Sequence, residues 1–377
     1  MFNPEKKILI VFGTRPEAIK MAPLVKEFQK YPERYNLKVC VTAQHREMLD
    51  QVLSFFDIVP DYDLNLMRPG QNLSQLTADI LLGMKGILED FCPDFVFVHG
   101  DTTTSMATAL AAFYNQTKVC HVEAGLRTFN KHSPFPEEIN RQITGRITDL
   151  HFAPTSKSSE NLLKEGTNAE NIVITGNTVI DALFLAQDKL KNYEDDEIKY
   201  LKSLELTQNK VILVTGHRRE NFGEGFINIC NALKIIAEDK DVLIIYPVHL
   251  NPNVQKPVKE ILDGIDNILL IDPLGYPAFS WLMGKSYFII TDSGGVQEEA
   301  PSLGIPVLVM RDNTERPEAV DAGTVKLVGT NTETIVREAK SLLTDKEVYD
   351  AMSLAHNPYG DGLSASRIVK AINNVGE

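Results

Sequence analysis

Short runs of β-branched and other apolar residues alternate with amphipathic stretches along the whole chain, and this alternation limits the fold more than any other feature. In the first half we expect strands at ILIVFG (8–13), KVCVTA (38–43), DFVFVHG (94–100), KVCHVEAG (118–125), LHFAPT (150–155) and NIVITG (171–176). The segments between them, such as 74–91 and 105–114, carry helical periodicity. This order predicts a parallel sheet that is covered by helices on both faces.

The second half repeats the scheme. We expect strands at 211–216, 242–248, 268–272, 287–292, 306–310 and 324–329. The charged segment 191–210 between the halves has low β-propensity, and we place it on the surface. The prediction is an α/β fold with two doubly wound Rossmann-like domains that face a central cleft, where a ligand would bind at the carboxyl ends of both sheets.

Chain length, net charge and the length of the apolar runs limit the classes of protein to which this chain can belong. A chain of 377 residues with 43% hydrophobic content is long enough for two or three domains, and we choose two. The formal net charge of −13 disfavours nucleic acid or an anionic membrane as a partner. The first apolar run is too short for a signal peptide, and no apolar stretch approaches the ~18 residues of a membrane span.

The four cysteines, Cys40, Cys92, Cys120 and Cys230, are scattered without CxxC spacing. This pattern favours neither a zinc site nor a disulfide framework. Together with the lack of an export signal, it leads us to expect a cytosolic protein.

Glycine-rich turns follow several of the expected strands. Neither half has a GxGxxG fingerprint, so a dinucleotide cofactor is not indicated. FGTRPE follows the first strand, and TDSGGVQEEA follows a later strand and opens a helix. A Ser-Gly-Gly turn at a helix start presents backbone N–H groups that suit a phosphate. The alternative is an ordinary strand-to-helix turn with Ser293 as the N-cap.

The turn GHRREN (216–221) places basic residues after another strand. They could face an anion in the cleft, or form a solvated loop that is paired with surface acids. The three turns lie at the carboxyl ends of strands and would together surround a diphosphate with Arg15, Lys20, His217, Arg218 and Ser293.

Three carboxylates also stand where an apolar run gives way to a turn: Asp101 in HGDTTT, Glu123 in HVEAGLR and Glu137 in PFPEEINR. A cluster of this kind suits proton transfer if burial or mutual repulsion raises the carboxyl pKa values. The alternative is capping or ion pairing, since Asp101 precedes TTT and Glu137 lies at a helix start. No metal-ligand spacing accompanies them, so we expect no metal.

Eight blocks occur in a characteristic order: FGTRPEAIKMAPL, TAQHREML, HGDTTT, HVEAGLRT, PFPEEINR, ITGNTVID, GHRREN and DSGGVQEEAPSLGIPVLVMR. As a set they closely resemble the bacterial non-hydrolysing UDP-N-acetylglucosamine 2-epimerases. The resemblance implies a glycosyltransferase-B-like fold in which a C-terminal helix crosses back to the N-terminal domain. The segment 357–372 is compatible with such a helix. We therefore expect an N-terminal domain with the catalytic carboxylates at 1–172 plus 362–377, and a UDP-binding domain at 173–361.

The resemblance implies reversible C2 epimerisation of UDP-N-acetylglucosamine to UDP-N-acetylmannosamine, for surface polysaccharide precursors, with no cofactor. UDP would be eliminated to leave 2-acetamidoglucal and then be added back. The catalytic residues implied are Asp101, Glu123, Glu137 and, as an imidazolium near the diphosphate, His217. The UDP-binding residues implied are Arg15, Lys20, Arg218, Phe279 in the loop PLGYPAF, Ser293, Gly294, Gly295 and Glu299, the last near a helix start. Which carboxylate serves which face of C2 stays open.

The family resemblance further implies a homodimer and a second molecule of UDP-N-acetylglucosamine that acts as an activator. Gln44, Arg218 and His249 resemble parts of that activator site. Glu47 and Gly70 depart from the pattern of some members.

Four alternatives stay open at this point. One is a hydrolysing relative that releases UDP and free N-acetylmannosamine, and another is an epimerase for a diacetamido-uronate nucleotide sugar. A glycosyltransferase could use the same two-domain fold. The last alternative is a non-catalytic nucleotide-sugar sensor.

Overall fold

The computed structural model of the protein describes residues 5–42, 46–66, 68, 70–314 and 316–375. Its four cysteines are free thiols. Over these described ranges, no helix is both long and apolar enough to cross a membrane.

The chain forms two compact units. One comprises Met1–Leu185 and Tyr359–Glu377, and the other comprises Ala186–Pro358. The first unit extends past the boundary expected at residue 172, because its last strand pairs with the strand before it and the N–H of Asn177 donates to the carbonyl oxygen of Tyr359 at 2.7 Å.

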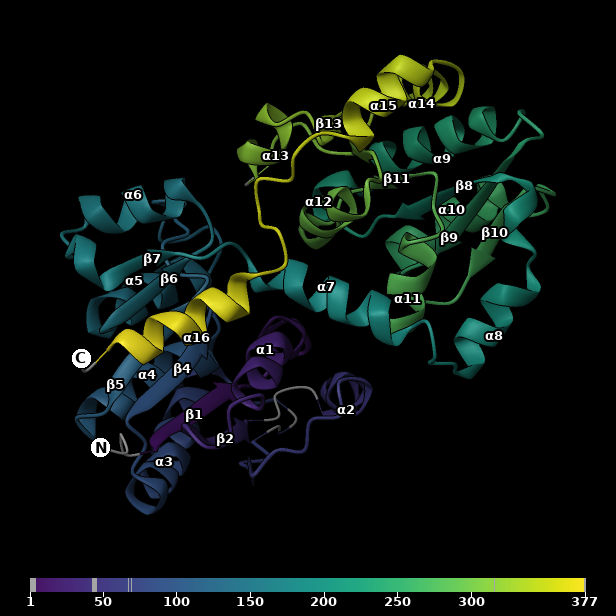
Figure 1. Cartoon of the computed structure of the whole chain (residues 1–377). Helices are drawn as coiled ribbons and strands as arrows, with labels where there is room; N and C mark the ends of the chain where they lie inside the picture. The colour runs from purple at the N-terminus through teal and green to yellow at the C-terminus, as the bar shows by residue number, and fades with distance from the viewer. Residues whose placement is uncertain (1–4, 43–45, 67, 69, 315, 376–377) are drawn as a thin grey trace. The chain divides into compact units, whose positions relative to one another are not determined.

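The first unit contains a seven-stranded parallel sheet in the order β3-β2-β1-β4-β5-β6-β7 (Figure 1). The strands are β1 (Lys6–Phe12), β2 (Tyr35–Val41), β3 (Tyr62–Asp63), β4 (Phe95–His99), β5 (Lys118–Val122), β6 (Leu150–Ala153) and β7 (Ile172–Ile174). The six strands predicted for this half are confirmed. The additional strand, β3, has two residues and is too short to show an alternating pattern.

Helices cover both faces of this sheet. They are α1 (Arg15–Phe28), α2 (Arg46–Phe55), α3 (Leu73–Phe91), α4 (Thr103–Tyr114), α5 (Glu137–Ile147), α6 (Ser156–Lys164), the first part of α7 (Thr178–Lys189) and α16 (Ser364–Asn374), with the 3₁₀ turn η1 (Ala169–Asn171). Apolar residues of α3 and α4 form one core with β1 and β4. On α1, Phe28 packs edge-on against Phe97 of β4, with ring centroids 5.5 Å apart.

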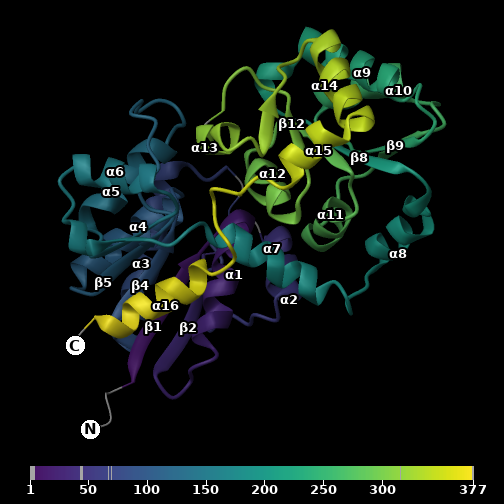
Figure 2. The same cartoon turned by 45° about the horizontal axis from the view of Figure 1, so that its top comes forward.

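The C-terminal helix α16 belongs to the first unit, as predicted. Figures 1 and 2 show it in yellow beside α1. The ammonium group of Lys6 donates to the carbonyl oxygen of Ile372 at 2.7 Å, and Ile368 and Ile372 are buried. The amphipathic pattern of the segment therefore reflects a helix that buries one face in the core of the first unit.

The second unit contains a six-stranded parallel sheet in the order β10-β9-β8-β11-β12-β13. The strands are β8 (Lys210–Thr215), β9 (Val242–Pro247), β10 (Ile268–Ile271), β11 (Phe288–Thr291), β12 (Val307–Val309) and β13 (Val325–Leu327). All six predicted strands are confirmed. Each unit is therefore a doubly wound α/β domain, as predicted.

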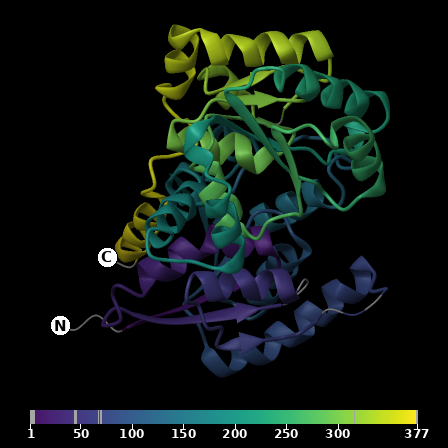
Figure 3. The same cartoon turned by 90° about the vertical axis from the view of Figure 1, so that its right-hand side faces the viewer.

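The helices of the second unit are α8 (Asp196–Ser203), α9 (Glu224–Ile236), α10 (Pro252–Leu262), α11 (Tyr276–Met283), α12 (Gly294–Glu299), α13 (Pro317–Asp321), α14 (Thr332–Thr344) and α15 (Lys346–Ser353), with the 3₁₀ turns η2 (Leu206–Gln208), η3 (Arg219–Asn221) and η4 (Ala300–Leu303). Figure 3 shows the strands of this unit between helices on both faces. The charged segment 191–210 is not wholly a surface segment, because it forms α8 and buries Ile198 and Leu201.

Candidate active site

The carboxyl ends of neighbouring strands in the first unit hold three of the predicted residues. Strands β1, β4 and β5 are adjacent. Arg15 begins the helix after β1, and Asp101 and Glu123 lie in the turns after β4 and β5. His99 lies opposite Val122 in the sheet register. Because these paired residues come just before Asp101 and Glu123, the two carboxylates stand at the same edge of the sheet, where open α/β sheets bind ligands.

Glu123 is held by a cation and an amide. Its carboxylate forms an ion pair with the ammonium group of Lys20, and it accepts a hydrogen bond from Nδ2 of Asn177 at 3.0 Å. Its backbone has φ of 63°, a conformation that residues other than glycine seldom adopt and that recurs at functional sites. Lys20 was expected to face the diphosphate, and here it neutralises the charge of Glu123.

A buried histidine lies beside this carboxylate. Nε2 of His99 is 3.9 Å from Oε2 of Glu123. Burial lowers the pKa of His99 to about 4, and the nearby charge of Glu123 only partly opposes this shift. His99 is therefore neutral at neutral pH, and the positive charge beside Glu123 comes from Lys20.

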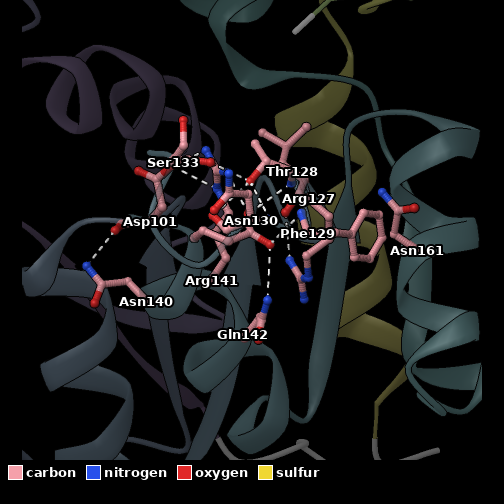
Figure 4. Close-up of polar contacts among 12 residues, drawn as sticks. Asp101, Arg127, Thr128, Phe129, Asn130, Ser133, Asn140, Arg141, Gln142 and Asn161 are labelled. Carbon is pink, nitrogen blue, oxygen red and sulfur yellow. Dashed lines mark hydrogen bonds and ion pairs between the residues drawn. The ribbon is translucent and has the colours of Figure 1, made fainter. Parts of the chain in front are cut away.

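Asp101 is bound by residues of α5. Arg141 donates to Oδ2 of Asp101 from Nε at 2.9 Å and from a terminal nitrogen at 2.6 Å, and Asn140 donates to the backbone carbonyl of Asp101 at 2.9 Å (Figure 4). The side chain of Asp101 keeps 26% of its surface exposed. It is thus a fixed carboxylate that a ligand could still reach.

Glu137 is the first residue of α5 and is partly buried. Asn140 and Arg141, which bind Asp101, lie on the first turns of the same helix. Asp101 and Glu123 therefore lie at one edge of the first sheet, and Glu137 begins the helix whose next turn binds Asp101.

In the second unit, a buried carboxylate organises the turn after β8. Oδ2 of Asp292 accepts the backbone N–H groups of His217 and Arg218, each at 2.9 Å, and Nδ2 of Asn221 at 3.3 Å. Strands β8 and β11 are neighbours, so the end of β11 fixes the loop that follows β8. This contact determines the position of His217 and Arg218.

The ring of His217 stacks on the ring of His249, with centroids 5.4 Å apart and planes 18° apart. Nδ1 of His249 accepts the backbone N–H of Asn251 at 3.1 Å. Burial lowers the pKa of His217, and His249 and Arg218 act in the same direction while Asp292 opposes them. The predicted imidazolium is therefore disfavoured in the ligand-free protein.

The Ser-Gly-Gly turn leads into the short helix α12. Ser293 occupies the N-cap position, but its side chain makes no capping bond; its backbone N–H donates to Oγ1 of Thr291 at 2.9 Å. Gly294 and Gly295 form the first turn of the helix. Glu299 is buried at the last position of α12 rather than near its start, because the helix ends after six residues.

Of two further predicted residues, the structure describes only one. Phe279 lies within α11 and not in a loop, because the helix already begins at Tyr276. Gln44, proposed for the activator site, lies outside the residues that the structure describes.

The family model for UDP-N-acetylglucosamine 2-epimerase matches residues 26–373. The chain belongs to this family. It is 62% identical over 373 residues to the UDP-N-acetylglucosamine 2-epimerase of Campylobacter jejuni, covering 97% of each chain.

Solved structures of the epimerase family agree with this assignment. The Neisseria meningitidis UDP-GlcNAc 2-epimerase, bound to UDP-GlcNAc, has a TM-score of 0.86 and 52% identity, over 97% of this chain and 99% of the other. The S. aureus MnaA structure with UDP has a TM-score of 0.85 and 48% identity, over 98% and 96% of the two chains. The protein is therefore an isomerase of the epimerase class.

Five polar residues of this epimerase were not among those predicted from the sequence. They are Glu17, Glu138, Arg141, Asn177 and Asp292. The capping-box spacing of Thr14 and Glu17 was a readable signal, and the structure contains that box. For Arg141 and Asn177 the sequence offers no comparable signal, because their partners Asp101 and Glu123 lie 40 and 54 residues away.

Proposed function

We propose that the protein interconverts UDP-N-acetylglucosamine and UDP-N-acetylmannosamine by eliminating UDP and adding it back, without net hydrolysis. The observation that carries the proposal is the pair of fixed carboxylates at one sheet edge, Glu123 beside Lys20 and Asp101 beside Arg141. The relatives solved with UDP-GlcNAc and with UDP support the choice of ligand.

The chemistry follows from the weak acidity of the C2–H bond. No carbonyl group adjacent to C2 can stabilise a carbanion there, so direct deprotonation is unfavourable. If the C1–O bond to UDP breaks as the C2 proton leaves, its electron pair departs with UDP and the C2–H pair forms the C1–C2 double bond of 2-acetamidoglucal. Returning a proton to the other face of C2 and re-adding UDP at C1 gives the epimer.

The first unit supplies the proton-transfer groups in this proposal. Glu123 and Asp101 exchange protons with C2, and Glu137, at the start of α5, takes part in the same step. Carboxylates that are fixed by neighbouring cations and amides are suited to this task, because their geometry is set before the substrate binds. The face of C2 that each serves is not assigned.

The second unit supplies groups for the leaving diphosphate. We assign this role to His217, Arg218 and the turn Ser293–Gly295. Arg15 is proposed as a further phosphate ligand, while Lys20 stays paired with Glu123. Phe279 is proposed beside the uracil and Glu299 at the ribose hydroxyls. The backbone N–H groups at a helix start and the basic side chains both favour an anion.

The finer parts of the assignment are proposals as well. We propose that UDP-N-acetylglucosamine also acts as an activator at a site that includes Gln44, Arg218 and His249, and that the protein is a homodimer. We also propose a cytosolic location, which the free thiols support, and a role in supplying surface polysaccharide precursors.

The decisive experiment is NMR of UDP-N-acetylglucosamine incubated with the protein in D₂O. We expect the UDP-linked manno epimer to appear, with deuterium at C2 of both epimers. Epimerisation without deuterium at C2 would overturn the elimination mechanism. Stoichiometric release of UDP and free sugar would instead identify a hydrolysing enzyme.

A further inference from the structure

We propose that Glu138 is a positioning residue that acts through Arg141 to set the orientation of Asp101 for proton transfer at C2. This inference rests on the proposed function and adds a residue to it. Glu138 follows Glu137 directly in the chain, but its side chain lies in the protein interior, with none of its surface exposed.

A buried carboxylate is tolerated only if its charge is compensated, and Glu138 meets this condition. Oε2 accepts the backbone N–H of Thr128 at 3.0 Å, while Oε1 accepts the backbone N–H of Phe129 at 3.1 Å and Nε2 of Gln142 at 3.1 Å. Burial raises the pKa of Glu138, but these hydrogen bonds outweigh it and the net pKa is lowered. Glu138 is therefore an anion at neutral pH.

Arg141 joins this anion to Asp101. One terminal nitrogen of Arg141 donates to Oε2 of Glu138 at 3.2 Å, while Nε and the other terminal nitrogen donate to Oδ2 of Asp101 at 2.9 and 2.6 Å. All three donor nitrogens of the planar guanidinium are thus engaged, which fixes the orientation of the plane. Without Glu138 the guanidinium would keep only the contacts at Asp101 and could rotate with it.

The same carboxylate also holds the loop that precedes α5. The backbone of Thr128 and Phe129 is bound to Glu138, and the hydroxyl of Thr128 donates to the carbonyl oxygen of Ser133 at 2.6 Å (Figure 4). Glu137 lies between this loop and the turn of α5 that carries Arg141. Glu138 therefore ties together the segments that present Glu137 and Asp101.

A purely structural role is the competing explanation, since an acidic residue in the first turn stabilises a helix. The two explanations predict different coupling between the effects of changing Glu138 and of changing Arg141. If Glu138 acts through Arg141, the effects of changing the two residues on the same catalytic step must not be additive. If Glu138 only stabilises α5, the effects of the two changes on kcat should multiply in the double variant.

The test compares Glu138→Gln, Arg141→Lys and the double variant in the full-length protein. Deuterium incorporation at C2 and the kcat and KM for UDP-N-acetylglucosamine are measured. We expect each single variant to lower kcat about a hundredfold, the loss typical of a catalytic group displaced by about 1 Å, with KM nearly unchanged. The double variant should lose about as much as Arg141→Lys alone.

Glu165→Gln is a matched control. Glu165 binds Arg127 through two hydrogen bonds, at 2.7 and 2.8 Å, so this variant also removes the charge from an Arg–Glu pair beside the same loop. It has no contact with Asp101 in the described hydrogen bonds and ion pairs of the chain. We expect a lower unfolding temperature but a kcat within about twofold of wild type, because stability loss alone does not alter turnover of the folded enzyme.

Wild-type kcat in folded Glu138→Gln, or losses that multiply in the double variant, would overturn the proposal. If Glu138→Gln does not fold, Arg141→Lys decides, because full C2 exchange in that variant would also overturn it. Failure of the wild-type protein to exchange the C2 hydrogen would instead reject the proposed function itself. The two failures are therefore distinguishable.

Discussion

The carboxylate of Glu17 accepts a hydrogen bond from the hydroxyl of Thr102 at 2.6 Å and so joins the turn after β1 to the start of α4. Its other oxygen accepts the backbone N–H groups of Gly13 and Thr14 at 3.0 and 2.8 Å. One buried side chain thus fixes the relative positions of two turns, and Arg15 and Asp101 lie beside them. The capping box of α1 is therefore also part of the framework of the site.

Glu17→Gln should change the pH dependence of stability. Burial raises the pKa of Glu17 in the folded state, against the effect of its hydrogen bonds. A raised carboxyl pKa favours the folded state at low pH, and this contribution is lost as the pH rises from about 4.5 through the folded-state pKa. We expect the stability of wild type relative to Glu17→Gln to fall over this range. Urea unfolding at several pH values measures it, and a constant difference would contradict the prediction.

Asn177→Asp should raise the apparent pKa of Glu123 during turnover. The amide nitrogen of Asn177 is 3.0 Å from Oε2 of Glu123, so the variant replaces a donor with a second carboxylate. Repulsion between neighbouring carboxylates typically shifts a pKa by at least about one unit. We expect the limb of the kcat–pH profile that reports Glu123 to move upward by about that amount. Asn177→Ser, which adds no charge, should move it less; equal shifts in the two variants would argue against repulsion.

UDP should bind more tightly as the pH falls, through His217. Burial lowers the pKa of this ring in the free protein, and an adjacent diphosphate would raise it again. Binding should therefore take up a proton, which calorimetry in buffers of different ionisation enthalpy can count. His217→Asn should abolish the proton uptake and weaken binding about tenfold. His356→Asn, at an exposed histidine, is the control, and the same uptake in both variants would remove His217 from the diphosphate site.

Asp181→Ala should weaken the docking of the C-terminal helix. Oδ1 of Asp181 accepts the backbone N–H of Ala365 at 2.8 Å and so caps α16 from a residue 184 positions away. Loss of a capping side chain typically costs about 0.5–2 kcal/mol. We expect a decrease of this size in the free energy of unfolding, measured in urea, while Asp181→Asn, which retains an oxygen acceptor, should lose less. Equal stability of the alanine variant and wild type would show that the cap contributes nothing.

Much of the fold could be predicted because its signals are local. The apolar runs at 8–13 and 211–216 mark the first strand of each sheet, and the amphipathic period near the C-terminus marks α16. Some features could not be predicted because they are too short to show an alternating pattern, such as β3. Others depend on where a helix begins and ends. Phe279 and Glu299 were misplaced for the second reason.

Residues close together in the chain are enough to predict the alternating α/β pattern, the turns at the strand ends and the candidate carboxylates. The side chains that hold those carboxylates are known only from the folded chain. Lys20 reaches Glu123 across 103 positions, and Arg141 reaches Asp101 across 40. Such partners become neighbours only when parallel strands align their carboxyl ends, so the charge and orientation of each catalytic candidate are properties of the folded sheet.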